Sequence, residues 1–228
     1  MLKWALVLSA VLLQCACSNR TEQAQKILQS HLGGKMELEF QSVEAFPGGA
    51  VCGEYRNNDP YRGSSRLRRF VVWSDKATAR PSKQDWAIFC SEDPAAALQA
   101  SYGIGPVSDE ESHLRQVRSD LRQLQSALEQ YRDDNFTLPT PAQGLAALVS
   151  ASTTPPLPIG FRAGGYIESL PMDPWERPYL YERPGLGGGV AQQFNLYTLG
   201  ADGLPGGTGN NADVALEHLK YLDLLIPQ

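Results

Sequence analysis

Histidine is scarce in this sequence, and the short motifs of common enzyme classes are absent. The 228 residues include only three histidines, His31, His113 and His218, in unrelated sequence contexts. We expect all three at the surface rather than in a catalytic or metal site. No G-x-S-x-G, H-E-x-x-H or P-loop pattern occurs, and the glycine run 185–189 lacks the strand-to-helix context of a dinucleotide-binding fingerprint. We therefore predict no catalytic residues, no small-molecule substrate and a protein that is not an enzyme.

An excess of positive charge is also missing. The net charge of −5 and the pI of about 5.3 repel phosphate backbones, so we predict no nucleic-acid partner. One basic cluster remains, in which arginines alternate with Leu67 and Phe70: Arg62, Arg66, Arg68 and Arg69. We interpret this cluster as the solvated edge of a strand, and the alternative is a site for an anionic partner.

The N-terminus has the pattern of a secretory signal. Lys3 supplies the positive charge, and an apolar run of ten residues from Trp4 to Leu13 follows, about half of what a bilayer-spanning helix requires. Ala16 directly before Cys17 resembles a bacterial lipobox, although Gln14 stands where leucine is usual. We predict a lipoprotein-type signal peptide over residues 1–17, with lipidation at Cys17 rather than at Cys15. The alternative is an ordinary cleaved signal that releases a soluble periplasmic protein.

The expected location in the cell envelope bears on the state of the remaining cysteines. If Cys15 leaves with the signal and Cys17 is lipidated, only Cys52 and Cys90 are left. An oxidising compartment favours a disulfide between them, which would stabilise a small fold by about 3 to 4 kcal/mol. A redox role is disfavoured because neither cysteine has a C-x-x-C neighbour. We expect the body to lie in the cell envelope, facing the periplasm and held by the lipid, with the outer membrane favoured.

Residues 20–103 read as a first small domain of the α+β class. A helix is expected where Ala24, Ile27, Leu28 and Leu32 share one face, before Gly33. Strands are expected over residues 36–41, 50–56, 67–73 and 85–90. The segments Val51–Glu54, Tyr61–Gly63 and Arg69–Phe70 resemble small uncharacterised secreted bacterial domains, and this resemblance implies no activity.

Residues 108–228 read as a second domain, after a glycine- and proline-containing linker near residues 102–106. Ser108 and Glu111 form a capping box. A long amphipathic helix follows, whose apolar residues repeat at spacings of three and four: Leu114, Val117, Leu121, Leu124, Leu128 and Tyr131. Thr140 and Pro141 predict a second helix start. Short strands are expected over 179–181 and 194–198, and we expect the helix to pack on this small antiparallel sheet.

Ordered motifs across this second domain resemble the globular head of the major pseudopilin of type II secretion systems, the protein G family. The motifs follow one another over roughly residues 110–214: Leu138–Thr140, Gln143–Leu145, Asp173–Trp175, Pro178–Tyr179 and Leu199–Gly203. The resemblance implies a pseudopilin-like helix-on-sheet fold with a long metal-type loop.

The loop from Leu199 to Asp213 holds the candidate metal site. It contains oxygen donors and glycines but neither histidine nor cysteine, which suits a hard cation, although composition alone favours a plain surface turn. The resemblance implies structural calcium binding. Carried over residue by residue, it implies as ligands the Leu199 carbonyl and the side chains of Asp202, Asn210, Asn211 and Asp213.

A pseudopilin is expected to carry a processing site and a long hydrophobic helix where this chain has a signal, a lipidation site and another domain. We therefore predict a non-catalytic envelope lipoprotein that uses its pseudopilin-like head to contact protein partners of a secretion or pilus-type system. The alternative is a stand-alone extracytoplasmic binding module that reuses the fold.

Overall fold

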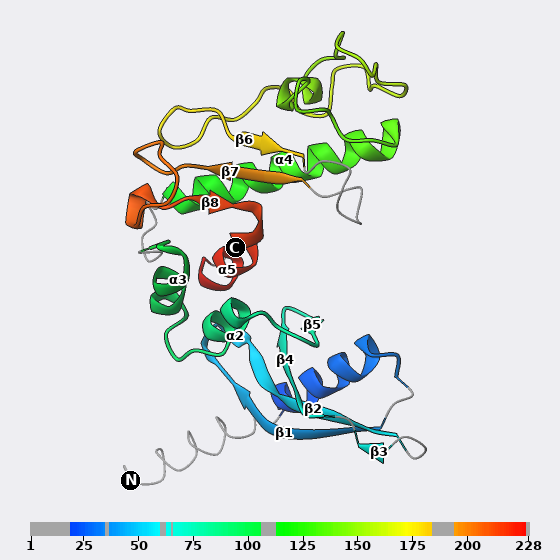
Figure 1. The fold of residues 1–228 in the computed structure, drawn as a ribbon, viewed down its shortest axis with the longest axis vertical. Helices are drawn as coiled ribbons and strands as arrows, with labels where there is room; N and C mark the ends of the chain where they lie inside the picture. Colours follow the sequence, from blue (N-terminus) through cyan, green and yellow to red (C-terminus); the bar gives the residue numbers. More distant parts are fainter. Residues whose placement is uncertain are drawn as a thin grey trace, which may run out of the picture. The chain divides into compact units, whose positions relative to one another are not determined.

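The computed structural model describes residues 19–34, 37–59, 63–64, 66–105, 113–183 and 194–226. The chain divides into two compact units, Met1–Ser101 and Tyr102–Gln228, and we describe each by itself (Figure 1). The predicted signal peptide over residues 1–17, the Ser108 capping box and the turn at 185–189 lie outside the described residues. No helix in the described part of the chain combines the length and apolar character needed to cross a membrane.

The first unit is built around an antiparallel sheet. The strands are β1 (Leu38–Ala45), β2 (Val51–Asp59), β3 (Gly63–Ser64), β4 (Arg68–Trp73) and β5 (Lys76–Thr78), and a short 3-10 helix, η1 (Pro47–Gly49), joins β1 to β2. Their order is β1-β2-β4-β5, and β3 pairs with the end of β2. A helix over residues 19–31 covers one face of this sheet, as its apolar spacing predicted (Figure 1).

The core of the first unit lies between that helix and the sheet. It consists of small and branched side chains packed around two rings: Ala24, Leu28, Val51, Tyr55, Phe70 and Val72. Gly53 faces Phe70 across the β2–β4 pair, where an added Cβ would lie 2.8 Å from the ring. Glycine at this position therefore lets the ring lie against the strand.

The prediction of a strand over residues 85–90 is wrong, because this segment forms helix α2 (Lys83–Phe89). Ser82 caps the helix: the Asp85 N–H donates to Ser82 Oγ over 3.0 Å, and the Asp85 carboxylate accepts the Ser82 N–H over 3.2 Å. This reciprocal cap fixes a helix start, and Ile88 and Phe89 are buried. Helix α3 (Pro94–Tyr102) follows and was not predicted.

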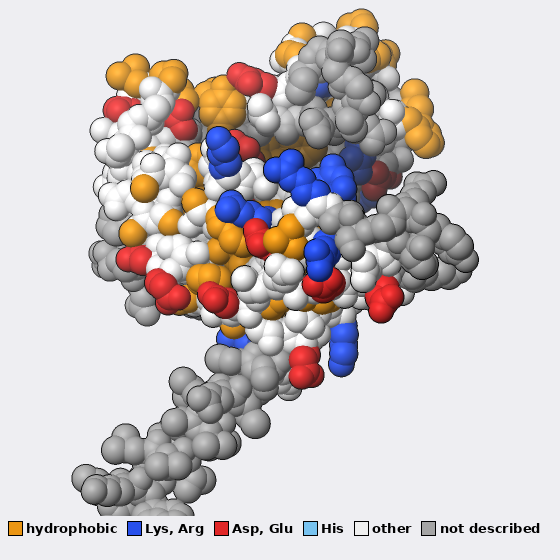
Figure 2. Space-filling model, turned by 60° about the horizontal axis from the view of Figure 1, so that its bottom comes forward, with side chains coloured by type: hydrophobic (Ala, Val, Ile, Leu, Met, Phe, Trp, Pro, Cys, Tyr) orange, Lys and Arg blue, Asp and Glu red, His pale blue; other side chains and the backbone are white. Residues whose placement is uncertain are grey.

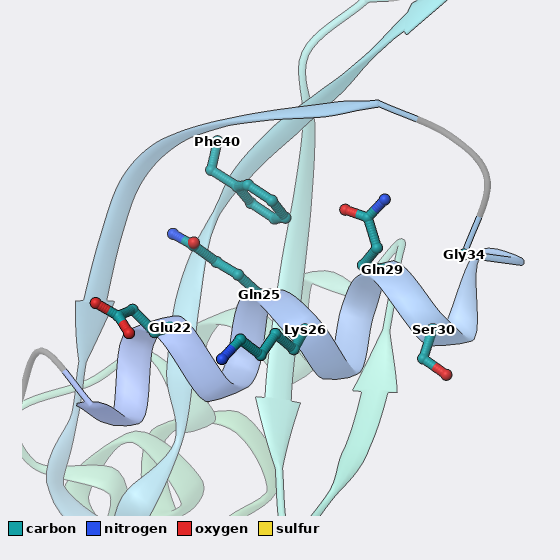
Figure 3. Close-up of a pocket in the computed structure, with 7 residues that line it drawn as sticks. All are labelled: Glu22, Gln25, Lys26, Gln29, Ser30, Gly34 and Phe40. Atoms are coloured by element: carbon teal, nitrogen blue, oxygen red, sulfur yellow. The ribbon is translucent and has the colours of Figure 1, made fainter.

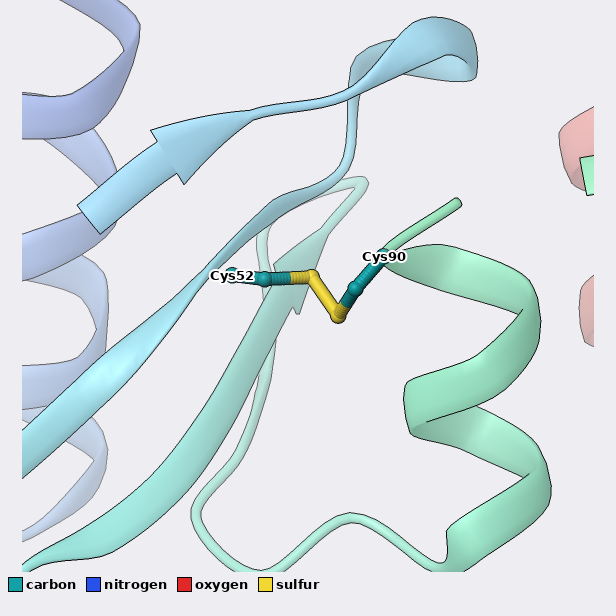
Figure 4. The surroundings of a disulfide bond; sticks show 2 residues. All are labelled: Cys52 and Cys90. Atoms are coloured by element: carbon teal, nitrogen blue, oxygen red, sulfur yellow. A yellow bond between two sulfur atoms is a disulfide. The ribbon is translucent and has the colours of Figure 1, made fainter. Parts of the chain in front are cut away.

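A disulfide joins α2 to the sheet. Cys52 of β2 is bonded to Cys90, the residue that ends α2, with a Cα–Cα distance of 5.8 Å (Figure 4). Successive residues of a strand point to opposite faces, and Val51 faces the helix over residues 19–31. Cys52 therefore points to the other face, and Figure 4 shows the sheet between that helix and α2.

The second unit packs one long helix on a three-stranded sheet. Helix α4 (His113–Asn135) buries the predicted apolar stripe: Val117, Leu121, Leu124, Leu128 and Tyr131. The strands are β6 (Leu180–Glu182), β7 (Asn195–Thr198) and β8 (Val214–Ala215), antiparallel in the order β6-β7-β8. Figure 1 shows α4 running along this sheet, and Leu196 of β7 is fully buried. The described residues therefore have the predicted α+β class.

The predicted helix start at Thr140 becomes a capped turn instead of a long helix. The Gln143 side chain accepts the Thr140 N–H over 2.8 Å, and Thr140 Oγ1 accepts the Gln143 N–H over 3.3 Å. Gly144 then has φ = 58°, outside the right-handed helical region, and only the short 3-10 helix η2 (Leu145–Leu148) follows.

The second unit ends in a helix that was not predicted. After the 3-10 turns η3 (Gly209–Asn211) and η4 (Leu216–His218), helix α5 (Leu219–Leu225) packs near α4. Arg122 of α4 pairs with Asp223, and Arg118 donates to the Ile226 carbonyl. Tyr221, Leu222 and Ile226 are buried, so α5 completes the core of this unit.

Candidate functional site: the loop of residues 199–213

The candidate metal loop connects the two paired strands β7 and β8. Thr198 pairs with Val214 and Tyr197 with Ala215, so both ends of the loop are fixed by the sheet. Within the loop, the Ala201 N–H donates to the Asn210 carbonyl over 2.7 Å, and the Asp213 N–H donates to the Gly206 carbonyl over 3.2 Å. The loop is therefore closed by backbone hydrogen bonds of its own.

Two glycines permit this close packing. Gly200 has φ = 63° and Gly207 has φ = 84°, a region that other residues rarely adopt. An added Cβ would lie 2.5 Å from the Asn211 carbonyl carbon at Gly200 and 2.3 Å from the Asn211 oxygen at Gly207. Glycine at both positions lets the backbone segments of the loop approach one another.

The two acidic residues of the loop differ in their surroundings. Asp202 is exposed, and its Oδ1 accepts the Leu204 N–H over 3.0 Å. Asp213 is half-buried: its Oδ2 accepts the Gly206 N–H over 2.9 Å. Its Oδ1 is buried and has no hydrogen-bond partner among the described residues. A buried carboxylate oxygen without a donor calls for a cation or an ordered water.

The other candidate ligands offer the oxygen atoms that calcium prefers, but they carry no charge. Asn210 and Asn211 are exposed, and Leu199 is half-buried. Among the described residues, no three acidic, histidine or cysteine side chains lie close enough together to hold a metal ion. A bound calcium would therefore rest on two carboxylates together with amide and backbone carbonyl oxygens, which are oxygen ligands that calcium accepts.

Arg177 places a fixed positive charge beside this loop. Its guanidinium donates to the Gly200 carbonyl, and an added Cβ on Gly203 would lie 2.3 Å from Arg177 Nη1. Arg177 Nε also lies 3.7 Å from Asp173 Oδ2. No sequence pattern indicates this contact. The arginine stabilises the first turn of the loop, and its charge opposes a second cation nearby.

The Asp173–Pro178 segment serves the fold. Asp173 is buried, and its carboxylate accepts hydrogen bonds from the Trp175 N–H at 3.0 Å, the Arg177 N–H at 2.9 Å and the Thr198 hydroxyl at 2.6 Å. A buried carboxylate whose oxygens all accept hydrogen bonds, with an arginine beside it, stabilises the fold. It connects this segment to β7, directly before the candidate loop.

A second polar pair ties α4 to the sheet. The Tyr179 hydroxyl donates to Asp120 Oδ2 over 2.8 Å. Burial, followed by the hydrogen bond to Asp120, raises the pKa of Tyr179 above its ordinary value, and burial also raises the pKa of Asp120. Because the pKa of Tyr179 is moved further from neutral pH, its hydroxyl stays protonated. It acts as a hydrogen-bond donor and not as a proton-transfer group.

His218 is buried, which corrects the expectation that all three histidines lie at the surface. His31 and His113 are exposed, whereas His218 is 5% exposed. Its Nδ1 accepts the Ala215 N–H over 3.0 Å, and its ring lies 4.4 Å from that of Tyr102. Burial lowers the pKa of His218. The apolar residues Leu219, Tyr221 and Leu222, which follow it closely, are the signal that could have indicated burial.

A hollow of about 620 Å³ lies between the helix over residues 19–31 and β1 in the first unit. Figure 3 shows Phe40 pointing from β1 toward the helix, with Gln25 and Gln29 on the helix side. Its charged lining residues, Glu22 and Lys26, are both exposed on the helix surface. The hollow therefore lacks the converging polar groups that fix a small ligand.

The fold and this site define a class: an α+β head in which one long helix packs on a small sheet and an oxygen-rich, glycine-rich loop joins two strands. The model of the family "Type II secretion system (T2SS), protein G" matches residues 107–217. Through this domain, the chain belongs to the family of type II secretion core protein G, the pseudopilin family.

Several curated relatives document this membership. The type II secretion system core protein G of Pseudomonas aeruginosa is 44% identical over 98 residues, which are 43% of this chain and 66% of the relative. That of Vibrio cholerae is 43% identical over 46% of this chain and 68% of the relative. That of Aeromonas hydrophila is 39% identical over 49% of this chain and 73% of the relative. The matched regions thus span about two thirds of these relatives.

Among solved structures, the major pseudopilin of the type 2 secretion system of enterohaemorrhagic Escherichia coli is 38% identical. The match covers 46% of this chain and 85% of the chain in that structure, with a TM-score of 0.39.

Proposed function

We propose that this chain is a non-catalytic envelope lipoprotein that presents a pseudopilin-type head to protein partners of a secretion or pilus-type assembly. The observation that carries the proposal is the family match over residues 107–217, because the named relatives are core components of a secretion system. The polar contacts of the head support a structural role, since the buried Asp173 and the half-buried Asp120 both join separate elements.

A surface of the head supports contact with another protein. Phe136, directly after α4, is 84% exposed, and Ile159 and Leu157 are 75% and 61% exposed. The Gly160 N–H donates to Asn135 Oδ1 over 2.9 Å, which brings the segments that carry Phe136 and Ile159 together. Phe136 also has φ = 55°, a conformation in which glycine is usual after a helix. An exposed ring kept in a strained position is poorly explained by folding alone.

Anchoring through Cys17 is the second part of the proposal. The lipobox-like Ala16–Cys17 pair lies two positions before residue 19, where the described part of the first unit starts. A lipid at Cys17 would hold that unit at a membrane surface. Mass spectrometry of the membrane fraction tests this: we expect an acylated N-terminal Cys17 and release of a Cys17→Ser variant. An unmodified N-terminus beyond Cys17 would contradict anchoring and favour a soluble periplasmic protein.

Calcium binding by the loop of residues 199–213 is the third part of the proposal. The Leu199 carbonyl and the side chains of Asp202, Asn210, Asn211 and Asp213 would hold the ion, which would fix the loop between β7 and β8. The partnerless Asp213 Oδ1 supports this, and Arg177 beside Gly200 predicts that affinity is modest.

Partner contact is tested by site-specific photo-crosslinking in living cells of the source organism. A crosslinker at position 136 should yield adducts with envelope proteins of a secretion or pilus-type system, and one at Ser126, exposed on α4, should not. Adducts at neither position, or only with unrelated soluble proteins, would favour the stand-alone binding module.

A further inference from the structure

The two units carry opposite net charge. Residues 1–101 contain twelve lysines and arginines against ten aspartates and glutamates, whereas residues 102–228 contain eight against fifteen. The acidic character of the whole chain therefore comes entirely from the second unit. The first unit has a small excess of positive charge, and the distribution of that charge over its surface decides what it can bind.

Three exposed arginines lie toward one end of the first unit's sheet, by the beginning of β4. Arg68 begins β4, and Arg66 lies two residues before it. Strand β5 pairs Thr78 with Val71, so the chain beyond Thr78 runs along β4 toward Arg68. The Tyr55 hydroxyl donates to the Ala79 carbonyl over 3.2 Å, and Tyr55 is the β2 partner of Arg68. This contact brings the segment that carries Arg80 to the same end of the sheet as Tyr55 and its strand partner Arg68. We call Arg66, Arg68 and Arg80 the basic edge.

The basic edge differs from the neighbouring arginines in having no acidic partner among the residues that the structure describes. Arg56 forms an ion pair with Glu39 at 2.7 Å, and Arg69 lies 4.0 Å from Glu54 and 4.6 Å from the centre of the Trp86 ring. No acidic side chain of the described residues lies within ion-pair distance of the basic edge. Figure 2 shows lysine and arginine side chains gathered on one face of the molecule. Unpaired arginines do little for the fold and remain available to an anionic surface.

We propose that the basic edge binds the anionic phospholipid headgroups of the membrane to which Cys17 is tethered. The inference rests on the proposed anchoring: the described part of the first helix starts at residue 19, two positions along the chain from Cys17, so a lipid at Cys17 would keep the first unit within reach of the surface. The occupant is anionic lipid by charge complementarity: guanidinium groups form paired hydrogen bonds with phosphate oxygens. Each basic residue at such a surface strengthens binding roughly fivefold. The basic edge would add a contact with the membrane surface to the attachment that the lipid at Cys17 provides.

The test uses the full chain with Cys17→Ser, so that no acyl chain contributes. Co-sedimentation is measured with phosphatidylcholine vesicles that contain about one third phosphatidylglycerol, and with pure phosphatidylcholine vesicles, at low and high salt. We expect binding to the anionic vesicles only, and its loss at high salt. Replacing all three arginines of the basic edge by alanine should weaken binding on the order of a hundredfold.

Two further variants distinguish a local surface from a general charge effect. Lysine at all three positions keeps the charge and should retain most of the binding. A control that removes the same charge from the second unit, Arg115→Ala with Arg132→Ala and Lys220→Ala, should bind like the parent chain. Equal binding to neutral vesicles, an equal loss in the control, or loss in the lysine variant would overturn the proposal. Acylation of Cys17 is measured separately, so that failure of vesicle binding with an acylated Cys17 rejects the basic edge alone.

Discussion

Both units of this chain place a helix on an antiparallel sheet, but they hold their remaining elements by different means. The first unit fixes α2 to the sheet with the Cys52–Cys90 disulfide. The second unit contains no cysteine and relies on the buried stripe of α4 and on polar ties such as Asp173 with Thr198. The family match falls on the second unit. We infer that the inherited head stabilises itself, while the preceding unit serves attachment to the envelope.

The largest expected effect comes from removing the disulfide. Cys52 and Cys90 are separated by 38 residues, and opening a loop of this length costs about 4 kcal/mol in the chain-entropy estimate. The double variant Cys52→Ala/Cys90→Ala should lower the unfolding free energy of the first unit and leave the second unchanged. Hydrogen exchange read by mass spectrometry resolves the two units. Equal loss of protection in both units would show that they unfold as one.

A smaller effect, now confined to the second unit, is expected from Leu124→Ala. Leu124 is fully buried in the stripe of α4, and truncation of such a leucine costs roughly 3 kcal/mol. Ser126→Ala, on the exposed side of the same helix, is the matched control and should change the unfolding free energy by less than about 0.5 kcal/mol. If Leu124→Ala also exposed the amides of the first unit to exchange, the independence of the two units would be refuted.

The smallest expected effect is a pH dependence confined to the second unit. Burial lowers the pKa of His218 below its ordinary 6.5, although the nearby Glu217 and Asp213 act to raise it and Lys220 to lower it. As the pH falls below 6.5, the unfolded chain takes up a proton that the folded chain refuses, so the unfolding free energy decreases toward the folded pKa. His218→Gln should remove this part of the slope in denaturant titrations between about pH 7 and 5. An unchanged slope would show that other groups cause it.

The sequence predicted the periodic elements well and the short ones poorly. The spacing of three and four residues predicted α4, and alternation predicted most strands, because both patterns reflect burial on one face. Residues 85–90 were assigned to a strand because a run of six is too short to show helical periodicity. The Ser82–Asp85 capping box was the better signal there. Helix α5 depends on packing near α4, which no local pattern encodes, whereas the apolar residues that follow His218 were a local signal of its burial.

The sequence predicted which residues form the candidate site but not the contacts that these residues make. The resemblance supplied Asp202, Asp213 and the two asparagines, and the structure adds two features that the sequence does not indicate. Asp213 Oδ1 is buried without a partner among the described residues, and Arg177 contacts Gly200 from 23 positions away in the chain. Both arise from tertiary packing.

The central proposal for the second unit is that the loop of residues 199–213 in this pseudopilin-type head holds calcium, and a melting curve in millimolar calcium against chelator tests it most directly. An ion that binds only the folded state stabilises it by about 2.7 kcal/mol at a hundredfold excess over Kd. For a unit of this size, that corresponds to a rise in Tm on the order of 10 °C. We expect this rise in the second unit only, and expect Asp213→Ala to abolish it. Identical melting curves in calcium and in chelator would contradict the claim and leave residues 199–213 as a plain surface turn.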